Sequence, residues 1–91
     1  MRNIIFHRRA AKYLGKMPKE RAAQVRDALQ EVAALDDIAA HPNVKQMSGN
    51  MTGWTRLRVG GYRAILQVTI IKVDEVIYVD AIGPRGDVYK G

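Results

Sequence analysis

The sequence predicts an α+β domain in which helices from the first half of the chain pack on a β-sheet from the second half. Nine of the eleven Ala residues precede position 41, whereas eleven of the seventeen Val and Ile residues follow position 53. Ala favours helices and β-branched residues favour strands. The chain has 91 residues, the size of one small domain, so a single domain over residues 1–91 is expected.

The first half predicts a short edge strand followed by two helices. The β-rich segment 3–7 is expected to form the strand, and residues 9–15 a brief helix. Pro18 suits the first turn of a second helix, where its missing N–H is not needed. His41-Pro42 is expected to end that helix, because the residue before a proline avoids the α region. The apolar stripe of the second helix, at helical spacing, consists of Ala22, Val25, Leu29, Val32, Ala33, Leu35 or Asp36, and Ile38.

The second half predicts a polar loop and then strands. Residues 43–53 are expected to be a loop that holds a short strand at 44–47. Residues 72–75 are expected to connect the last two strands, and residues 83–91, with three Gly and one Pro, to form a loop or tail. The three longer strand-like runs cover residues 54–59, 62–71 and 76–82.

Gly60-Gly61 predicts a two-residue hairpin turn between the first two long strands, because such turns need a positive φ that Gly adopts cheaply. The turn sets the register, from Val59 opposite Tyr62 to Trp54 opposite Gln67. Directly opposed residues share a face. One face, the expected floor for the amphipathic helix, therefore carries Leu57, Val59, Tyr62, Ala64 and Leu66.

The opposite face of this hairpin, here called the arginine face, carries Arg56, Arg58 and Arg63. Like charges opposed across strands are destabilising, so this face requires an anion. A carboxylate from elsewhere in the fold, or solvent, would satisfy any single arginine, and Arg58 best fits such a structural role. For all three together a nucleic-acid backbone fits better. The other residues of this face are Trp54, Ile65 and Gln67.

Composition limits the classes of function. Lys and Arg number 15 against 9 Asp and Glu, which gives a net charge of +6 and a pI near 10.0 and favours a polyanionic partner. The absence of Cys excludes a disulfide framework, a thiolate zinc site and a cysteine nucleophile. No apolar run approaches the roughly 20 residues that span a bilayer, and the first residues do not resemble a signal peptide. A cytoplasmic protein with no membrane partner is therefore expected.

Two motifs resemble those of the RelE/ParE superfamily of bacterial toxin–antitoxin toxins. They are Trp-Thr-Arg-Leu-Arg-Val-Gly-Gly-Tyr-Arg at 54–63 and Ile-Gly-Pro-Arg-Gly-Asp-Val-Tyr at 82–89. The resemblance covers nearly the whole chain and implies a helical hairpin on one face of a twisted, mainly antiparallel sheet of four to five strands. RelE-like members are metal-independent endoribonucleases that cut mRNA in the ribosomal A site. ParE-like members share the fold, lack the RNase residues and poison DNA gyrase.

The resemblance also implies partners and roles. It implies a cognate antitoxin encoded nearby, a toxin–antitoxin hetero-oligomer, the ribosome and mRNA as partners, and no cofactor or metal. Arg63 and Arg85 would stabilise the phosphorane formed by 2′-hydroxyl attack, Arg56 would hold the RNA backbone, and Tyr89 would stack on a base or donate a proton. These four matches favour the RNase branch. Further RNA contacts are expected from Trp54, Arg58, Lys45 and Lys90.

The sequence is compatible with three functions: a toxin endoribonuclease, a ParE-like gyrase inhibitor without nuclease activity, and a non-catalytic RNA-binding module. Trp54 replaces the lysine of RelE-type toxins, so the resemblance assigns no general base. His7 and His41 are weaker catalytic candidates, because both are expected to lie away from the arginine face.

Overall fold

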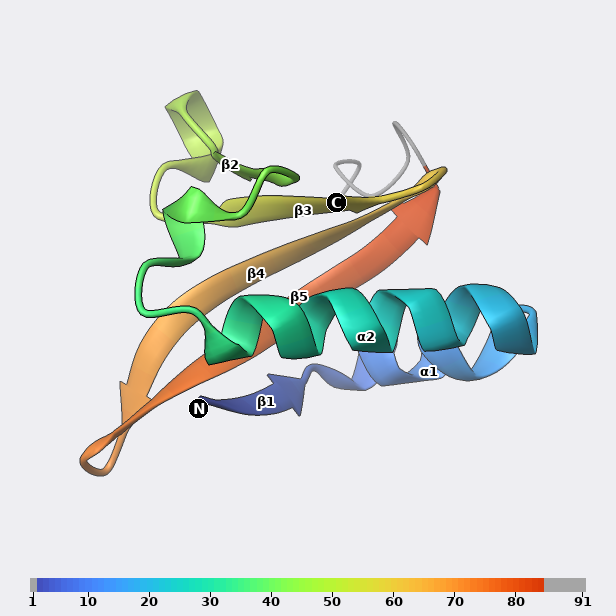
Figure 1. Ribbon diagram of the computed structural model, residues 1–91, viewed down its shortest axis with the longest axis horizontal. Helices are drawn as coiled ribbons and strands as arrows, with labels where there is room; N and C mark the ends of the chain where they lie inside the picture. Colours follow the sequence, from blue (N-terminus) through green and yellow to red (C-terminus); the bar gives the residue numbers. More distant parts are fainter. Residues whose placement is uncertain (1, 85–91) are drawn as a thin grey trace.

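In a computed structural model, which describes residues 2–84, two helices pack on one face of a five-stranded sheet (Figure 1). The strand order is β1-β5-β4-β3-β2, with β1 parallel to β5 and the other neighbours antiparallel. The predicted α+β class, with a helical hairpin on one side of a mainly antiparallel sheet, is confirmed. The elements are β1 (Asn3–Phe6), α1 (Arg8–Lys16), α2 (Lys19–Ala34), η1 (Ile38–Ala40), β2 (Val44–Gln46), η2 (Gly49–Met51), β3 (Thr55–Val59), β4 (Tyr62–Ile71) and β5 (Asp74–Pro84), where η marks a single 3-10 turn.

The first helix is fixed to the sheet at its N-terminal end. The His7 side chain caps α1 by accepting a hydrogen bond from the Arg9 amide at 3.0 Å. The Arg9 guanidinium donates to the Asp80 carbonyl at 3.0 Å and also pairs with the Asp80 carboxylate on β5. Ala10 and Leu14 are buried below the helix. These contacts direct the remaining side of α1 to solvent.

The second helix supplies the predicted apolar stripe to the core between the helices and the sheet. Leu29 and Val32 are fully buried, and so are Leu57 and Leu66 on the facing strands. None of the helices within residues 2–84 is long and apolar enough to cross a membrane. The buried core consists of Ala10, Leu14, Met17, Ala22, Val25, Leu29, Val32, Ala33, Ile38, Leu57, Ala64, Leu66, Ile77, Val79 and Ile82.

The prediction that α2 continues to His41-Pro42 was wrong, because the helix ends at Ala34. Leu35 leaves the helix with extended backbone angles, φ −79° and ψ 143°. Ile38 still reaches the core, but from the separate turn η1, which the Asp37 side chain caps by accepting from the Ala39 amide at 3.1 Å.

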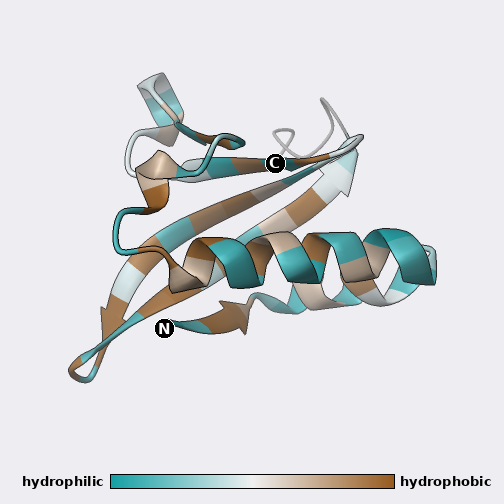
Figure 2. Ribbon diagram, viewed as in Figure 1, coloured by the Kyte–Doolittle hydropathy of each residue, from teal (hydrophilic) through white to brown (hydrophobic). Residues whose placement is uncertain are grey.

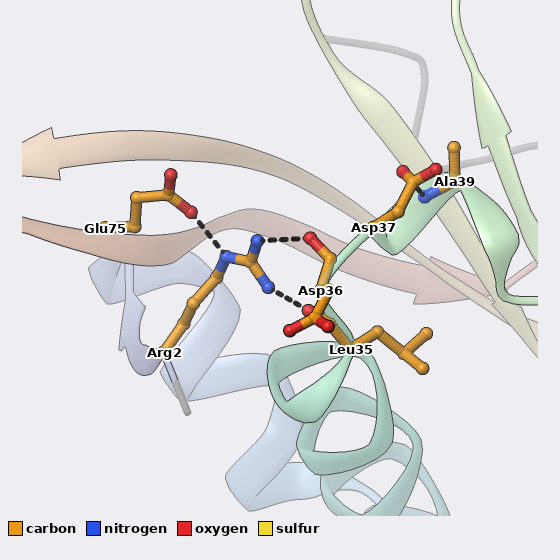
Figure 3. Close-up of polar contacts among 6 residues, drawn as sticks. All are labelled: Arg2, Leu35, Asp36, Asp37, Ala39 and Glu75. Carbon is orange, nitrogen blue, oxygen red and sulfur yellow. Dashed lines mark hydrogen bonds and ion pairs between the residues drawn. The ribbon is translucent and has the colours of Figure 1, made fainter.

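Arg2 binds the carbonyls at the end of α2 (Figure 3). Its guanidinium donates to the Leu35 carbonyl and, at 3.0 Å, to the Asp36 carbonyl, and it pairs with Glu75 at 2.8 Å. The Arg2 amide donates to the Ala33 carbonyl at 3.0 Å. The Leu35 and Asp36 carbonyls directly follow α2, where no further helical turn supplies N–H partners, so this cation satisfies them and joins the helix end to β5.

Arg2→Met should lower the free energy of unfolding by about 2 kcal/mol, because carbonyls that a charged donor satisfies lose their partner. Most of this effect comes from the carbonyl contacts, since the carboxylate partner Glu75 is half exposed. Urea unfolding would measure the change. Arg21→Met is the matched control, because Arg21 is exposed and bonds only the Gln24 side chain in the described structure. Equal destabilisation by the two variants would contradict the role of Arg2.

The register predicted for the first hairpin is confirmed from Val59 opposite Tyr62 to Thr55 opposite Leu66. Leu57, Ala64 and Leu66 lie in the core, so this face is the floor beneath the helices as predicted. The ladder stops before Trp54, whose predicted pairing with Gln67 was therefore wrong. The Trp54 carbonyl instead accepts from the Met47 amide at 3.0 Å.

Gly60→Ala should destabilise the fold by about 1 kcal/mol, whereas Gly61→Ala should be close to neutral. Gly60 has a φ of +59° and Gly61 does not have a positive φ, so only the first requires the left-handed region. A Cβ at either position meets no atom within 4 Å, which leaves backbone strain as the difference. Thermal unfolding of the two variants would check this, and an equal change in Tm would contradict it.

The third long strand is longer than predicted at both ends. β5 runs from Asp74 to Pro84, so Asp74 and Glu75 are not part of the connection and Gly83-Pro84 are not part of a tail. The turn after β4 consists of two residues, Lys72 and Val73. Pairing across the sheet extends the strand in both directions, because Ile71 pairs with Asp74 and Tyr62 with Pro84. Local composition cannot reveal such pairing.

A β-bulge interrupts the pairing of β4 with β5. Ile65 pairs with Ala81 and Leu66 with Val79, so Asp80 is the extra residue. A bulge re-aims a side chain and bends the strand. Here it frees Asp80 to hold Arg9 of α1.

Candidate functional site

The face of the sheet opposite the helices carries a cluster of basic residues on three adjacent strands. Lys45 on β2 pairs directly with Arg56 on β3, and Arg58 on β3 pairs with Arg63 on β4. Side chains directly opposed in this way have Cβ atoms about 5 Å apart, and diagonal neighbours such as Arg56 and Arg63 about 7 to 8 Å. The predicted arginine face is thus formed, and Lys45 belongs to it.

The residues of the arginine face differ in exposure. Arg58 and Lys45 are exposed, whereas Arg56 and Arg63 are half-buried and the Nε atom of Arg63 is fully enclosed. Ile65, between the two half-buried arginines, is only 1% exposed and gives the face an apolar floor. A guanidinium held in such surroundings loses less side-chain freedom on binding an anion.

Small residues of β5 complete this region. Ala81 pairs with Ile65, and Gly83 pairs with Arg63. Neither brings a large side chain next to the arginines. Glycine inside a strand often marks a place where another backbone approaches closely.

The electrostatic environment of the arginine face is positive. The chain has no acidic residue between Asp37 and Asp74, the segment that contains β2, β3 and β4. Two carboxylates of β5 make ion pairs away from this face, Glu75 with Arg2 and Asp80 with Arg9. Arg58 makes no ion pair with any residue in the described part of the chain. Such a surface raises the local concentration of anions.

The remaining sequence candidates fall in different places. Trp54 is half-buried directly before β3. Arg85, Tyr89 and Lys90 lie outside the described residues, so the structure does not place them. Among residues 2–84 there is no group of three or more His, Asp or Glu that is arranged to hold a metal ion.

Both histidines make structural contacts outside the cluster of Lys45, Arg56, Arg58 and Arg63. His7 caps α1 and lies edge-on to the Tyr78 ring, with centroids 6.4 Å apart. His41 is 9% exposed; its Nδ1 accepts from the Asn43 amide at 3.1 Å and its Nε2 lies 3.2 Å from Glu31 Oε1. These contacts account for both side chains without a catalytic role.

The direct pairing of Lys45 with Arg56 was not predicted from the sequence. The signal that could have indicated it is the alternation in the short strand, where Val44 packs against the core and Lys45 is exposed. The residues of β2 do not indicate which strand lies beside β2 in the sheet, because β2 and β3 are separated by the loop that contains η2.

Residues 4–89 match the family described as "ParE toxin of type II toxin-antitoxin system, parDE". The chain belongs to this ParE toxin family. It is therefore a toxin of a type II toxin–antitoxin system, within the RelE/ParE superfamily that its motifs indicated. No protein of curated function matches its sequence.

Solved structures of related toxins share the fold of this ParE-family toxin. RelE in the archaeal RelE–RelB complex from Pyrococcus horikoshii is 25% identical with a TM-score of 0.73, and the match covers 93% of this chain and 96% of that one. The Escherichia coli RelBE toxin–antitoxin complex contains a chain that is 28% identical, with a TM-score of 0.69 and coverages of 92% and 96%. The YoeB/ParE toxin from Agrobacterium tumefaciens has a TM-score of 0.74 over 91% and 98% of the two chains, but at 10% identity it supports the fold alone.

Proposed function

We propose that this ParE-family toxin is an endoribonuclease that cleaves mRNA on the ribosome and so inhibits translation. The observation that carries the proposal is the arginine face, where Lys45, Arg56, Arg58 and Arg63 gather on three strands within a segment that lacks acidic residues. The matches of Arg85 and Tyr89 to the RelE-type motif add to it. The RelE structures that share the fold support this branch.

The proposed reaction uses the RNA's own nucleophile. The 2′-oxygen attacks the adjacent phosphorus, the bond from phosphorus to the 5′-oxygen breaks, and the products carry a 2′,3′-cyclic phosphate and a 5′-hydroxyl. The 2′-hydroxyl gives up one proton and the departing 5′-oxygen gains one. Negative charge accumulates on the phosphorane oxygens between these events, so fixed donors near the phosphorus lower the barrier.

The residues divide into charge stabilisation and substrate holding. Arg63 is suited to the phosphorane, because its guanidinium is half-buried and its position on β4 is set by two neighbouring strands. Arg85 would act beside it. Arg56 and Lys45, paired across β2 and β3, would hold the phosphates next to the cleaved bond.

The other residues predicted to bind RNA would hold its backbone and bases around these groups. Arg58 and Lys90 would contact the backbone, while Trp54 and Tyr89 would stack on bases. Stacking contributes about 1 to 3 kcal/mol per base and tolerates any sequence. In this arrangement the ribosome positions the mRNA, so a small domain needs few contacts of its own.

A cognate antitoxin is the proposed inhibitor, and action on the ribosome places the toxin in the cytoplasm. The RelE–RelB and RelBE structures are toxin–antitoxin complexes, and a hetero-oligomer of this kind is proposed here. An acidic or amphipathic antitoxin peptide that covers the arginine face would compete with the ribosome. A pull-down in which ribosome and antitoxin bind the toxin simultaneously and independently would contradict this competition.

A ParE-like gyrase inhibitor is the second candidate, because the matching family is described as the toxin of the parDE system. Such a toxin would bind gyrase and perform no chemistry. The sheet face would then be a protein-binding surface. A purified supercoiling assay with gyrase would detect it, together with accumulation of gyrase-linked DNA breaks in cells.

The deciding experiment is brief induction of the toxin in cells, with mRNA 5′ ends mapped and gyrase-linked breaks counted in the same cultures. New 5′-hydroxyl ends within coding regions and unchanged breaks are expected. Growth arrest with intact transcripts would overturn the nuclease proposal. Increased breaks would favour gyrase inhibition, and normal growth without antitoxin would favour a non-catalytic RNA-binding module.

A further inference from the structure

The solvent side of α1 is a surface of unbroken positive charge on the helical layer. The nine-residue helix contains Arg8, Arg9, Lys12 and Lys16 and no acidic residue. Arg9 pairs with Asp80, whereas Arg8, Lys12 and Lys16 are exposed and make no ion pair with any residue from 2 to 84. These three cations, together with the exposed small residues Ala11 and Gly15 beside them, are called the α1 strip.

The charges of the α1 strip disfavour the helix at its N-terminal end and along its length, although Lys16 lies in the last turn, where the helix dipole favours a cation. Arg8 lies in the first turn, where the helix dipole repels cations, and that turn has no acidic residue to offset it. Arg8, Lys12 and Lys16 follow one another at i, i+4 spacing, which places like charges side by side. The neighbouring α2 differs, because acidic residues such as Glu20, Asp27 and Glu31 alternate with its basic ones.

Gly15 is a second feature of the α1 strip that the fold itself does not require. Glycine inside a helix is less favourable than alanine. Gly15 is exposed, it does not have a positive φ, and a Cβ placed on it meets no atom within 4 Å. Neither backbone conformation nor internal packing therefore calls for glycine here. Together with Ala11 at i−4, it leaves bare helix backbone beside the cations.

We propose that the α1 strip binds the sugar-phosphate backbone of double-stranded RNA. Residues that destabilise their own helix, and that packing within the protein does not require, are expected to serve a function. Phosphate contacts need cations and close approach of the backbone, which the α1 strip offers. A protein helix would need apolar anchors, and a single strand would need aromatic platforms; the α1 strip has neither.

The position of α1 separates the α1 strip from the arginine face. The helices cover one face of the sheet, and the arginine face is the other, so the two basic surfaces point in different directions (Figure 1). The α1 strip can therefore hold structured RNA while the arginine face receives mRNA. This inference rests on the proposed function for the identity of the second RNA, which would be a duplex region of the ribosome. Binding of a duplex to the α1 strip can be measured without cleavage.

The test uses a fluorescent 20-base-pair duplex of 2′-O-methyl RNA, which lacks the attacking hydroxyl, titrated with toxin from 50 to 250 mM KCl. The variant Arg8→Gln/Lys12→Gln/Lys16→Gln is compared with Lys19→Gln/Arg21→Gln/Arg26→Gln, which removes the same charge from exposed positions of α2. The slope of the logarithm of the association constant against log salt is negative, and each lost phosphate contact should reduce its magnitude by about 0.9, so for the α1 triple variant the magnitude should fall by about 2 to 3. For the α2 variant the magnitude should fall by less than about 1.

Gly15→Ala adds an independent measurement. Its Tm should rise by about 4 °C, because alanine favours the helix, yet its affinity for the duplex should fall about threefold, because the methyl group separates backbone and phosphate. Unchanged or tighter duplex binding by Gly15→Ala would overturn the role of close approach.

Equal salt slopes for the two triple variants would overturn the proposal. So would loss of antitoxin capture by the α1 variant with duplex binding intact, since this would make the surface a protein interface. Failure of the toxin to cleave mRNA would refute the proposed function, but it would leave the uncleavable-duplex result valid, so the two failures are distinguishable.

Discussion

Arg63→Ala is expected to lower the rate of mRNA cleavage by at least about 100-fold, the effect of removing one preorganised donor from a developing oxyanion. Arg63 lies in the middle of the sheet, paired with Arg58 on one side and Gly83 on the other. Its Nε is enclosed and the residue is half-buried, which restricts the freedom of the side chain. A donor held in this way needs no reorganisation when charge develops on the phosphate.

The measurement is single-turnover cleavage of mRNA on programmed ribosomes, with saturating toxin so that binding does not limit the rate. Arg21→Ala, which removes the same charge from an exposed position of α2, should cleave within about threefold of the wild type. Arg63→Lys should remain well below the wild type, because a lysine lacks the planar fork of donors. A folded Arg63→Ala variant that cleaves as fast as Arg21→Ala would contradict the assignment.

Leu66→Ala is expected to lower the free energy of unfolding by about 3 kcal/mol, because it leaves a cavity in the middle of the core. Leu66 is 0% exposed on the helix side of β4. A loss of this size is a large fraction of the roughly 5 to 15 kcal/mol that stabilises a small domain. The variant should therefore unfold at clearly lower urea concentration.

Ile70→Ala is the matched control. Side chains alternate between the two faces of a strand, so residues 66 and 70 of β4, four positions apart, lie on the same face. Ile70 is 66% exposed, near the tip of the β4–β5 hairpin, which extends beyond the helices and carries both hydrophobic and hydrophilic residues (Figure 2). The Ile70→Ala substitution should lower the free energy of unfolding by less than about 0.5 kcal/mol. The free energies of unfolding of the two variants would be obtained from the midpoints and slopes of urea unfolding. Similar decreases for both variants would contradict the prediction that the core ends where the helices stop covering β4.

The predictions from sequence were accurate where a turn or a repeating pattern of nearby residues determines the structure. The Gly60-Gly61 turn set the register of β3 and β4, and the register assigned Leu57 and Leu66 to the core and Arg58 and Arg63 to the opposite face. The apolar stripe of α2 was equally clear from Val25 to Val32. Each of these features depends on residues close together in the chain.

The predictions were wrong or incomplete where contacts with residues distant in the sequence determine the structure. The end of α2 was misplaced because the chain leaves the helix at Leu35, where Arg2, distant in the sequence, binds the Leu35 and Asp36 carbonyls. The limits of β5 were misplaced because pairing with β4 extends it. Asp80 could not be assigned a role before the bulge and Arg9 were seen together.

For the candidate site, the sequence by itself determined that Arg56, Arg58 and Arg63 share one face of a hairpin, because side chains alternate and the turn sets the register. Only the tertiary structure decided that Lys45 joins them and that Ile65 forms a buried floor. The physical reason is that alternation and turn geometry act over a few residues. The order of strands in the sheet, and the burial that follows from it, depends on contacts between segments that meet only in the folded chain.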